Sequence, residues 1–417
     1  MNTKALRQKV LDLAIHGKLV PQNPNDESAT VLLEKIRAEK AEKIKKGELK
    51  ADKKDSFIFT KECEFDEDKL GKCSAGTRHK RHYEQFADGT VKDIEDEIPF
   101  EVPEGWAWCR LKEIAFVTAG KTPSKDAFVD EGIPYIKMYN LRNQKIDFDF
   151  QPQFIKREVH EKLLQKSQTE VGDLLMNIVG PPLGKLAFIP DSLPEANFNQ
   201  AAVLIRPHTF KKLINKYLFF FLSEMSEINS IATKGSAGQD NISLTQSQNM
   251  RIPLPPFAEQ ERIISTIENL FTQIDILEQN KTELQTVIKQ TKSKILDLAI
   301  HGKLVPQDPN DEPAEELLKR IATSDNRPYK KIEEEEPYEL PSNWSWCYLC
   351  DICSKIKRGK SPKYTDKSTI MAFAQKCNQK DGPTSLEKAL YIDESTLKKY
   401  PKDEKMQFND IVINSTG

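Results

Sequence analysis

The segment LDLAIHGKLVPQ stands at residues 11–22, and the same twelve residues return unchanged at 296–307. The correspondence continues downstream in the same order, and four further pairs of segments match: 23–36 with 308–321, 98–114 with 336–352, 120–125 with 359–363, and 172–180 with 409–417. A repeat of this length is too long to be the period of a solenoid. The sequence therefore predicts a duplicated domain, with one complete copy and about the first half of a second copy.

The first copy carries an additional charged segment that the second copy lacks. It is rich in Lys, Glu and Asp and poor in aliphatic residues, which favours a solvated linker that is helical at its start. The expected segments are an N-terminal helical segment (1–37), this linker (38–97), an α/β domain (98–255), a central helical region (256–322), a second linker (323–336) and a partial second domain (337–417). The expected fold class is α/β domains joined by long coiled-coil helices.

After Pro255 and Pro256, apolar residues alternate in steps of three and four for five heptads, which is typical of a coiled-coil helix. The prolines before the pattern and Gly302 after it predict a helix over about 257–301. The apolar residues expected on its seam, as an interface with a partner, are Ile263, Ile267, Leu270, Ile274, Leu277, Leu284, Ile288 and Ile295. We expect an antiparallel partner helix, and residues 6–13 offer a short one. One long core helix of an ordinary domain is the alternative.

Four loops of the α/β domain combine glycine, lysine and amide side chains: GKTPSK (120–125), KMYNLRNQK (137–145), GPPLGK (180–185) and KGSAGQDN (234–241). Lysines and backbone amides in such loops position phosphates, while Asn, Gln and Arg read base edges. The residues expected to bind DNA are Lys121, Lys125, Lys185 and Lys234 on phosphates, Tyr139, Asn140, Arg142, Gln239 and Asn241 near base edges, and Lys137 beside them. For each of them the alternative is an ordinary polar residue on a turn.

The composition limits the classes of function that the chain can have. A net charge of −2 counts mildly against a nucleic-acid binder, although the placement of the charges matters more. Seven irregularly spaced cysteines favour the reducing cytoplasm, and no run of about 18 apolar residues predicts a membrane span.

The sequence shows no catalytic motif. GPPLGKL lacks the glycine spacing and the Ser/Thr of a P-loop, and no other catalytic motif is found. No metal site is expected, with zinc at Cys347, Cys350 and Cys353 as the minor alternative. His16 and His301 are interpreted as helix-ending residues rather than as a catalytic pair.

Six motifs follow one another between residues 105 and 264: GWAWCRLKEI, GKTPSK, GIPYIK, GDLLMNIVGPPLGKLAF, GSAGQDNIS and IPLPPFAEQERII. In this order they resemble the specificity subunit of type I restriction–modification systems, and the resemblance covers nearly the whole chain. It implies two α/β target-recognition domains held apart by antiparallel helices, each reading one half of a split DNA site. It also implies a non-catalytic chain without a cofactor of its own. The implied partners are double-stranded DNA, methyltransferase subunits and motor–nuclease subunits, with S-adenosylmethionine, ATP and Mg²⁺ on those subunits.

The sequence departs from that family's pattern at INSTG (413–417), where the second recognition domain stops before a second PLPPxAEQ helix. This departure predicts a fragment, the product of a rearranged gene, or a shortened subunit that pairs with itself. The preferred interpretation is a specificity subunit that directs adenine methylation and cleavage to a split DNA site. Two other classes stay open: a stand-alone nuclease or methyltransferase with its own recognition domain, and an inactive coiled-coil scaffold.

Overall fold

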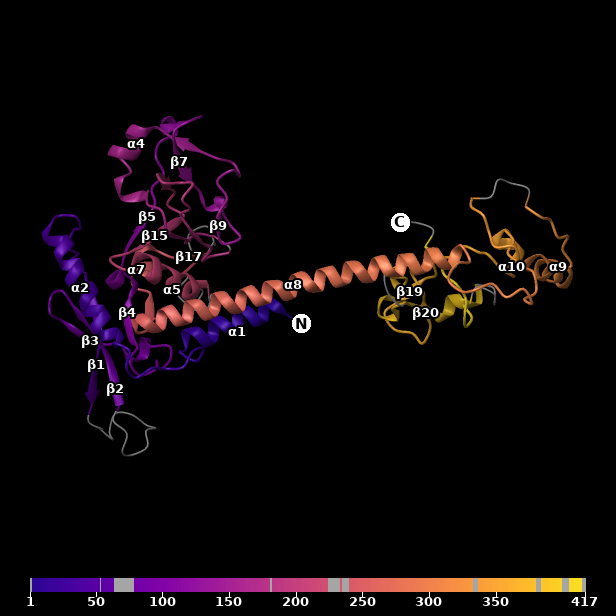
Figure 1. Cartoon of the computed structure of the whole chain (residues 1–417), viewed down its shortest axis with the longest axis horizontal. Coiled ribbons are helices and arrows are strands. Elements are labelled where there is room, and N and C mark those ends of the chain that lie inside the picture. The colour runs from indigo at the N-terminus through magenta and orange to yellow at the C-terminus, as the bar shows by residue number, and fades with distance from the viewer. Residues whose placement is uncertain are drawn as a thin grey trace. The chain divides into compact units, whose positions relative to one another are not determined.

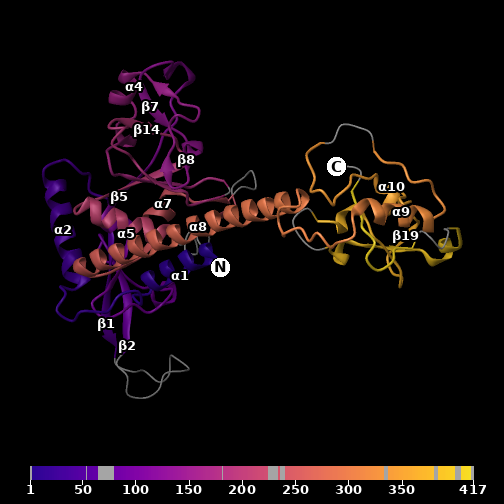
Figure 2. The ribbon, with the colours of Figure 1, turned by 45° about the vertical axis from the view of Figure 1, so that its right-hand side comes forward.

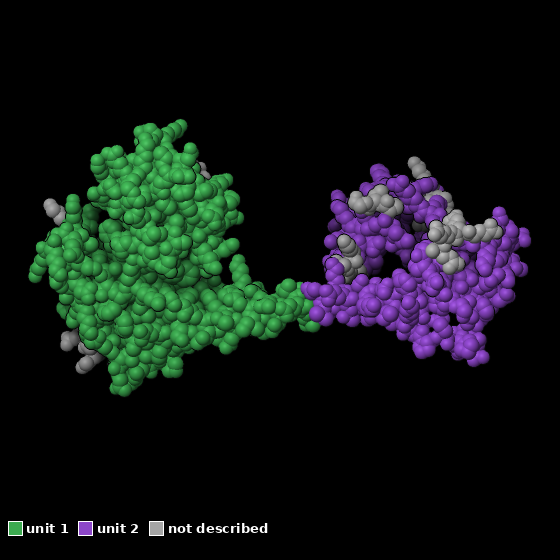
Figure 3. Space-filling model, turned by 45° about the horizontal axis from the view of Figure 1, so that its top comes forward, with its two compact units in different colours: residues 1–285 green, residues 286–417 purple. Residues whose placement is uncertain are grey.

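The computed structural model describes residues 2–52, 54–63, 79–180, 182–223, 233–234, 240–332, 337–379, 384–399 and 405–414. The chain divides into two compact units, Met1–Gln285 and Thr286–Gly417, which Figure 3 colours separately. None of the described helices is long and apolar enough to cross a membrane.

Both units mix helices and strands, in agreement with the expected fold class. The helices of unit 1 are α1 (Thr3–Ile15), α2 (Ala29–Lys45), α3 (Leu111–Ile114), α4 (Arg157–Lys162), α5 (Lys211–Ser223), α7 (Leu244–Gln248) and most of α8 (Phe257–Ile300). Its strands are β1 (Ser56–Cys63), β2 (His79–Phe86), β3 (Val91–Asp93), β4 (Ala107–Arg110), β5 (Ala115–Ala119), β6 (Phe128–Val129), β7 (Ile133–Ile136), β8 (Leu141–Arg142), β9 (Lys145–Ile146), β10 (Phe154–Ile155), β11 (Gln168–Thr169), β12 (Leu174–Asn177), β13 (Leu186–Phe188), β14 (Ala196–Phe198), β15 (Ala202–Pro207), β16 (Thr233–Lys234), β17 (Asp240–Asn241) and β18 (Arg251–Leu254). Unit 2 contains α9 (Ala314–Ser324), α10 (Leu349–Ile352) and the strands β19 (Tyr364–Thr365), β20 (Met371–Ala372) and β21 (Leu390–Ile392).

The centre of unit 1 is a four-stranded antiparallel sheet in the order β13-β12-β15-β5. Successive residues of a strand point to opposite faces of a sheet. In β15, Val203 and Ile205 enter the apolar cluster that α5 covers, while Leu204 enters a second cluster on the other face. Since both faces are buried, only the two ends of these strands reach the surface.

Further strand pairings build the rest of the domain. A five-stranded sheet has the order β11-β14-β7-β10-β6, with β14 parallel to β7, and its strands alternate along the chain with those of the four-stranded sheet. Strand β18 pairs with β4, so the expected domain 98–255 begins and ends with neighbouring strands.

The charged segment 38–97 is not a linker in its described part, and that prediction is wrong. Helix α2 extends into it, and β1, β2 and β3 form a three-stranded antiparallel sheet. Ile58 of this sheet packs against Trp108 of the domain. Arg110 and Glu84 are both buried and pair at 2.5 Å. The charge-rich composition concealed this fold because some of the charges are paired in the interior rather than solvated.

Helix α1 lies antiparallel along the first part of α8 (Figures 1 and 2). Val10 and Leu11 pack with Ile263 and Ile267, whereas the earlier residue Arg7 pairs with the later Asp275. The predicted helix over about 257–301 is confirmed, since α8 has 44 residues.

The predicted seam of α8 divides into a covered and an exposed part. Ile263, Ile267 and Ile274 are buried and Leu270 is half-buried. Every residue from 275 to 297 is exposed, and this stretch contains four further seam residues: Leu277, Leu284, Ile288 and Ile295. The seam's role as an interface with a partner stays a prediction.

Both copies of LDLAIHGKLVPQ have the same local structure. We call joint 1 the residues 11–22 with Phe100, Pro103 and Trp106, and joint 2 the residues 296–307 with Tyr338, Pro341 and Trp344. In each joint a histidine ends the helix, with its Nδ1 2.7 Å from a carbonyl oxygen four residues earlier (His16 and Asp12, His301 and Asp297). Each histidine ring lies 4.2 Å from an aromatic ring (Phe100 or Tyr338). The repeat in the sequence is therefore a repeated structural joint between a helix end and a proline–aromatic segment.

Candidate nucleic-acid interface

Three strands of the four-stranded sheet, β5, β12 and β15, begin or end at the same end of the sheet. Asn177, the last residue of β12, pairs with Ala202, the first of β15, and Val203 pairs with Ala119, the last of β5. The loops that leave the sheet there are 120–124, 178–185 and 199–201. We call this surface the loop end, and it contains two of the four loops predicted to bind DNA.

The loop after β5 has a fixed backbone. A Cβ on Gly120 would lie 2.2 Å from the Asn199 carbonyl oxygen, so only glycine fits. The Lys121 amide donates to the Phe198 carbonyl at 3.2 Å, and the Lys121 carbonyl accepts from the Tyr135 hydroxyl at 3.1 Å. Burial raises the pKa of Tyr135, which keeps that hydroxyl a donor. The Lys121 side chain itself is exposed.

Asn177 holds the loop after β12, and its role was not predicted from the sequence. Its buried amide donates to the Pro182 carbonyl at 2.9 Å, and its side-chain oxygen accepts from the Lys185 amide. The Gly184 amide donates to the Asn177 carbonyl at 3.1 Å. An asparagine that ends an apolar strand just before a Gly-Pro-Pro turn was the available signal, since such a buried amide needs partners.

The loop 234–241 reaches the same surface at its described end. The Gly180 amide donates to the Asp240 carbonyl at 3.0 Å, and Val179 forms an isolated bridge with Asn241. Lys234 lies in β16, opposite Asp240. Gln239 lies outside the described residues.

In the segment 137–150, Asn140 corrects a prediction. Its side chain is buried rather than facing a base edge. Its amide nitrogen donates to the carbonyls of Asp147 (3.0 Å) and Phe150 (2.8 Å), while its oxygen accepts from the Lys137 amide at 2.8 Å. All of its hydrogen-bonding capacity is directed inward, so Asn140 positions this segment and has no group left for a base.

The other predicted residues of this segment are closer to the surface. Tyr139 is half-buried, its hydroxyl donates to the Gln151 carbonyl at 3.1 Å, and burial raises its pKa. Lys137 is half-buried, with its ammonium 5.6 Å from the centre of the Phe128 ring. Arg142 is exposed and lies 4.2 Å over the Phe150 ring.

Arg142 and Lys185, predicted from two separate loops, line one hollow of about 450 Å³. Within the described residues, no carboxylate lies within ion-pair distance of Lys121, Lys125 or Lys185, whereas Arg142 faces Asp147 at 3.6 Å. Lysines without a carboxylate partner are available to the phosphates of a nucleic acid.

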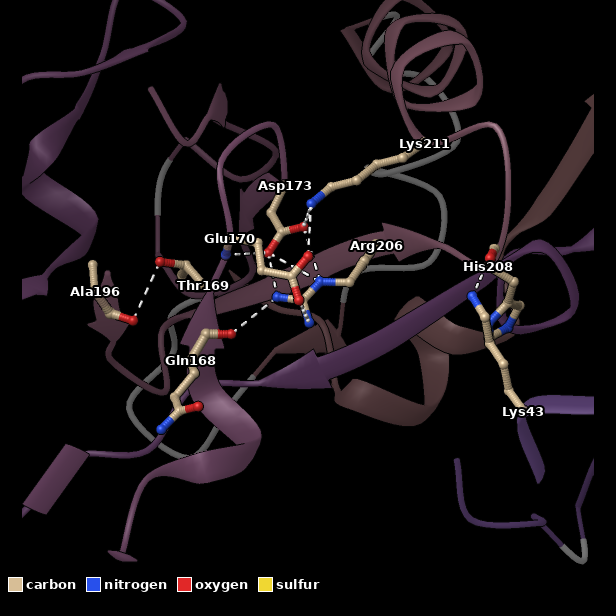
Figure 4. Close-up of polar contacts among 9 residues, drawn as sticks. All are labelled: Lys43, Gln168, Thr169, Glu170, Asp173, Ala196, Arg206, His208 and Lys211. Atoms are coloured by element: carbon tan, nitrogen blue, oxygen red, sulfur yellow. Dashed lines mark hydrogen bonds and ion pairs between the residues drawn. The ribbon is translucent and has the colours of Figure 1, made fainter. Parts of the chain in front are cut away.

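The opposite end of the same sheet is built in another way (Figure 4). Asp173 is fully buried and accepts from the Arg206 Nε at 3.0 Å and pairs with Lys211 at 2.7 Å. Glu170 pairs with Arg206 at 2.7 Å and with Lys211 at 3.1 Å. Two cations thus face two carboxylates, so this end anchors the start of α5 and offers no net charge to a ligand.

No three His, Cys, Asp or Glu side chains of the described residues are grouped as ligands of a metal ion. Cys347, Cys350 and Cys353 therefore do not form such a group there.

The residues that form this surface lie in a region that is similar to known proteins. Residues 103–286 match the family described as type I restriction modification DNA specificity domain. The chain is 31% identical over 473 residues to the type I restriction enzyme EcoAI specificity subunit of Escherichia coli, covering 99% of this chain and 72% of the relative. It is 29% identical over 420 residues to the EcoEI specificity subunit of the same species, covering 86% of this chain and 63% of the relative. A crystal structure of the HsdS subunit from Thermoanaerobacter tengcongensis aligns at a TM-score of 0.37 and 22% identity, covering 49% of this chain and 47% of that one. The region matched by the family includes the loop end and the start of α8.

Proposed function

Because the chain belongs to the family of type I restriction enzyme specificity subunits, we propose that unit 1 reads one part of a DNA target through the loop end. The role of the chain is recognition of a DNA sequence rather than catalysis. The observation that carries the proposal is the meeting of separate Gly-, Lys- and Asn-containing loops at one end of a sheet.

The chemistry of the loop end fits the backbone of double-stranded DNA. Lys121 and Lys185 supply positive charge at the loop end, where the fixed backbones of their loops hold them in place, and Lys125 follows the first of these loops. Each lysine on a phosphate releases counterions, so affinity falls as the salt concentration rises. The net charge of −2 does not oppose this, because the cations are local.

Unit 2 is proposed to belong to a second copy of the recognition unit. The matching contacts of joint 1 and joint 2 support this, since the same residues make the same contacts in each unit. A second half of the DNA target would then belong to this copy, and the two halves would form a split site.

The exposed apolar residues of α8 support a helical partner. Leu277, Leu284 and Ile288 lie in the stretch 275–297, and apolar residues at heptad spacing need a facing helix. An antiparallel helix would continue the pairing that α1 begins. Methyltransferase subunits, which hold S-adenosylmethionine, and motor–nuclease subunits, which use ATP and Mg²⁺, are the further partners proposed, in the cytoplasm where DNA is found.

DNA binding tests the proposal. The chain, combined with its methyltransferase subunit, is titrated with duplex DNA over a range of salt concentrations. The double variant Lys121→Ala, Lys185→Ala is expected to bind more weakly, with the slope of log affinity against log salt reduced by about 2, because each lost phosphate contact contributes about 1. Lys216→Ala is the matched control, because Lys216 pairs with Glu268 at 2.6 Å outside the loop end.

Three outcomes contradict the proposal. If the double variant and the control bind DNA equally well, the loop end is not the DNA-binding surface. If the wild-type complex binds no DNA, the inactive-scaffold interpretation replaces it. Methyl transfer by the chain alone would favour a stand-alone enzyme.

A further inference from the structure

The turn between β8 and β9 is exposed at all four of its residues, Arg142 to Lys145. Because Arg142 pairs with Lys145, Asn143 and Gln144 form a two-residue turn, and both have positive φ angles of 49° and 59°. These angles are typical of a type I′ turn, whose twist suits a tight hairpin. Asparagine adopts this conformation readily but glutamine does so rarely, so the surrounding structure holds Gln144 at the tip against a local strain.

The base of the hairpin is rigid. Leu141 is buried in the apolar cluster on the second face of the four-stranded sheet, and Ile146 and Phe148 pack against that cluster. Asn140 ties the segment together through its bonds to the carbonyls of Asp147 and Phe150. A rigid base holds a tip in one orientation, which reading a base edge requires.

Two hollows adjoin the tip. Asn143 and Gln144 line one hollow of about 450 Å³ together with Gly184 and Lys185. Arg142, Asn143 and Lys145 line another of about 570 Å³, whose far wall includes Ser192. A two-stranded ribbon with an exposed tip is an element that the major groove of DNA admits, since the groove is about 12 Å wide.

We propose that this turn is the base-reading element of unit 1, with the side chains of Asn143 and Gln144 hydrogen-bonding base edges in the major groove of double-stranded DNA. The proposal rests on the DNA-recognition function proposed above and names the residues that choose the sequence. Within the described residues neither side-chain amide makes a hydrogen bond, and both residues are exposed, so the NH₂ group and the oxygen of each amide are open to a ligand. An amide of this kind matches the N6 and N7 atoms of adenine. Arg142 is already held by Phe150 and Asp147, and Lys185 on the facing wall is placed for a phosphate.

The test replaces each amide by a carboxylate of the same shape, in Asn143→Asp and in Gln144→Glu. Aspartate tolerates the same backbone conformation as asparagine, and a carboxylate accepts from the N4 amino group of cytosine instead of pairing with adenine. Each variant is combined with the methyltransferase subunit. The DNA motif that the wild-type complex methylates is mapped first. The affinity of each variant is then measured on a duplex with that motif and on duplexes with one base pair changed at a time.

The expected result is a loss of roughly 5- to 150-fold on the wild-type motif, with an altered preference at one or two adjacent base pairs and unchanged preference elsewhere. Gln151→Glu is the matched control, because Gln151 is an exposed glutamine with φ of 53° outside the turn, and the added charge is the same. A loss that is equal on every duplex and equal to that of the control overturns the proposal. If both variants keep the base-pair preference of the wild type, the turn does not read bases, although the proposed DNA-recognition function still stands. A wild-type complex that prefers no sequence removes both.

Discussion

Joint 1 and joint 2 contain the same twelve residues and make the same local contacts, but they differ in burial. Leu11 is 6% exposed and its counterpart Leu296 is 65% exposed. Trp106 is 7% exposed and Trp344 is 40% exposed. The difference comes from α8, whose Ile263 and Ile267 cover joint 1. The comparison teaches that a short sequence sets its own conformation, whereas its contribution to stability depends on what packs against it.

The largest expected difference between the joints is that of Leu11→Ala and Leu296→Ala. Leu11 lies in a closed apolar cluster, so its truncation leaves a cavity and should lower the opening free energy of unit 1 by about 2–5 kcal/mol. Leu296 is exposed, so the same change in unit 2 should stay within about 0.5 kcal/mol. Hydrogen exchange of peptides from each unit measures both values. Equal losses would mean that joint 2 is covered in solution.

Gly17→Ala and Gly302→Ala should instead act alike. Both glycines have positive φ angles, of 64° and 63°, and an added Cβ would lie 2.3 Å from the ring of Pro103 or Pro341. The left-handed conformation costs an L-residue about 1–2 kcal/mol, and the contact with proline adds to this. We therefore expect a loss of about 2–3 kcal/mol in each unit by hydrogen exchange. A loss confined to unit 1 would show that joint 2 does not keep this conformation in solution.

The two joints also show what the sequence could predict. The repeat predicted that residues 11–22 and 296–307 share one structure, because helix ends, glycine turns and aromatic contacts are local. The heptads of 257–301 likewise predicted α8, since a sustained apolar period defines a helix. The sequence could not predict that one joint is covered and the other exposed, because burial depends on segments far away in the chain.

The candidate site likewise combines features that the sequence could predict with features that it could not. The loops that gather at the loop end were predicted from their glycines and lysines, which report a turn and a charge directly. The inward orientation of Asn140 and the outward orientation of Asn143 and Gln144 were not predicted, because a positive-φ turn without glycine leaves little trace in the sequence. The sheet within 38–97 was missed because its charges pair with one another.

Trp106→Phe and Trp344→Phe each keep an aromatic ring but remove the indole N–H. The pair therefore separates the contribution of a hydrogen bond to stability from that of packing. The Trp106 indole donates to the buried Glu259 carboxylate at 2.9 Å, so its loss leaves that carboxylate with Gln22 as a remaining donor. We expect about 1–2 kcal/mol of lost stability in unit 1 and almost none in unit 2. Burial raises the pKa of Glu259, so the folded state binds its proton more tightly and loses stability as the pH rises through that pKa.

Removing the Trp106 donor disfavours the charged carboxylate further. The loss in Trp106→Phe should therefore be larger above neutral pH than in mild acid, whereas Trp344→Phe should show no such dependence. Hydrogen exchange at two pH values, corrected for intrinsic rates, decides this. A loss that does not vary with pH would mean that Glu259 is already neutral in the wild type.

The smallest loss of stability is expected from His16→Ala and His301→Ala, and it should be nearly equal in the two joints. Each histidine lies 2.7 Å from a carbonyl oxygen of its own helix and 4.2 Å from one aromatic ring, and both rings are partly exposed. A partly exposed hydrogen bond between a ring nitrogen and a carbonyl contributes about 0.5 kcal/mol, at the lower end of the range for hydrogen bonds within a protein. Both variants should therefore lose about 0.5 kcal/mol, detected as faster exchange of the last-turn amides of α1 and of α8. Since Ile263 and Ile267 of α8 cover joint 1 whereas Leu296 and Trp344 of joint 2 are exposed, an equal loss shows that the helix end is stabilised by local contacts alone. A loss several times larger in His16→Ala would mean instead that the histidine transmits the packing of α8 into the joint.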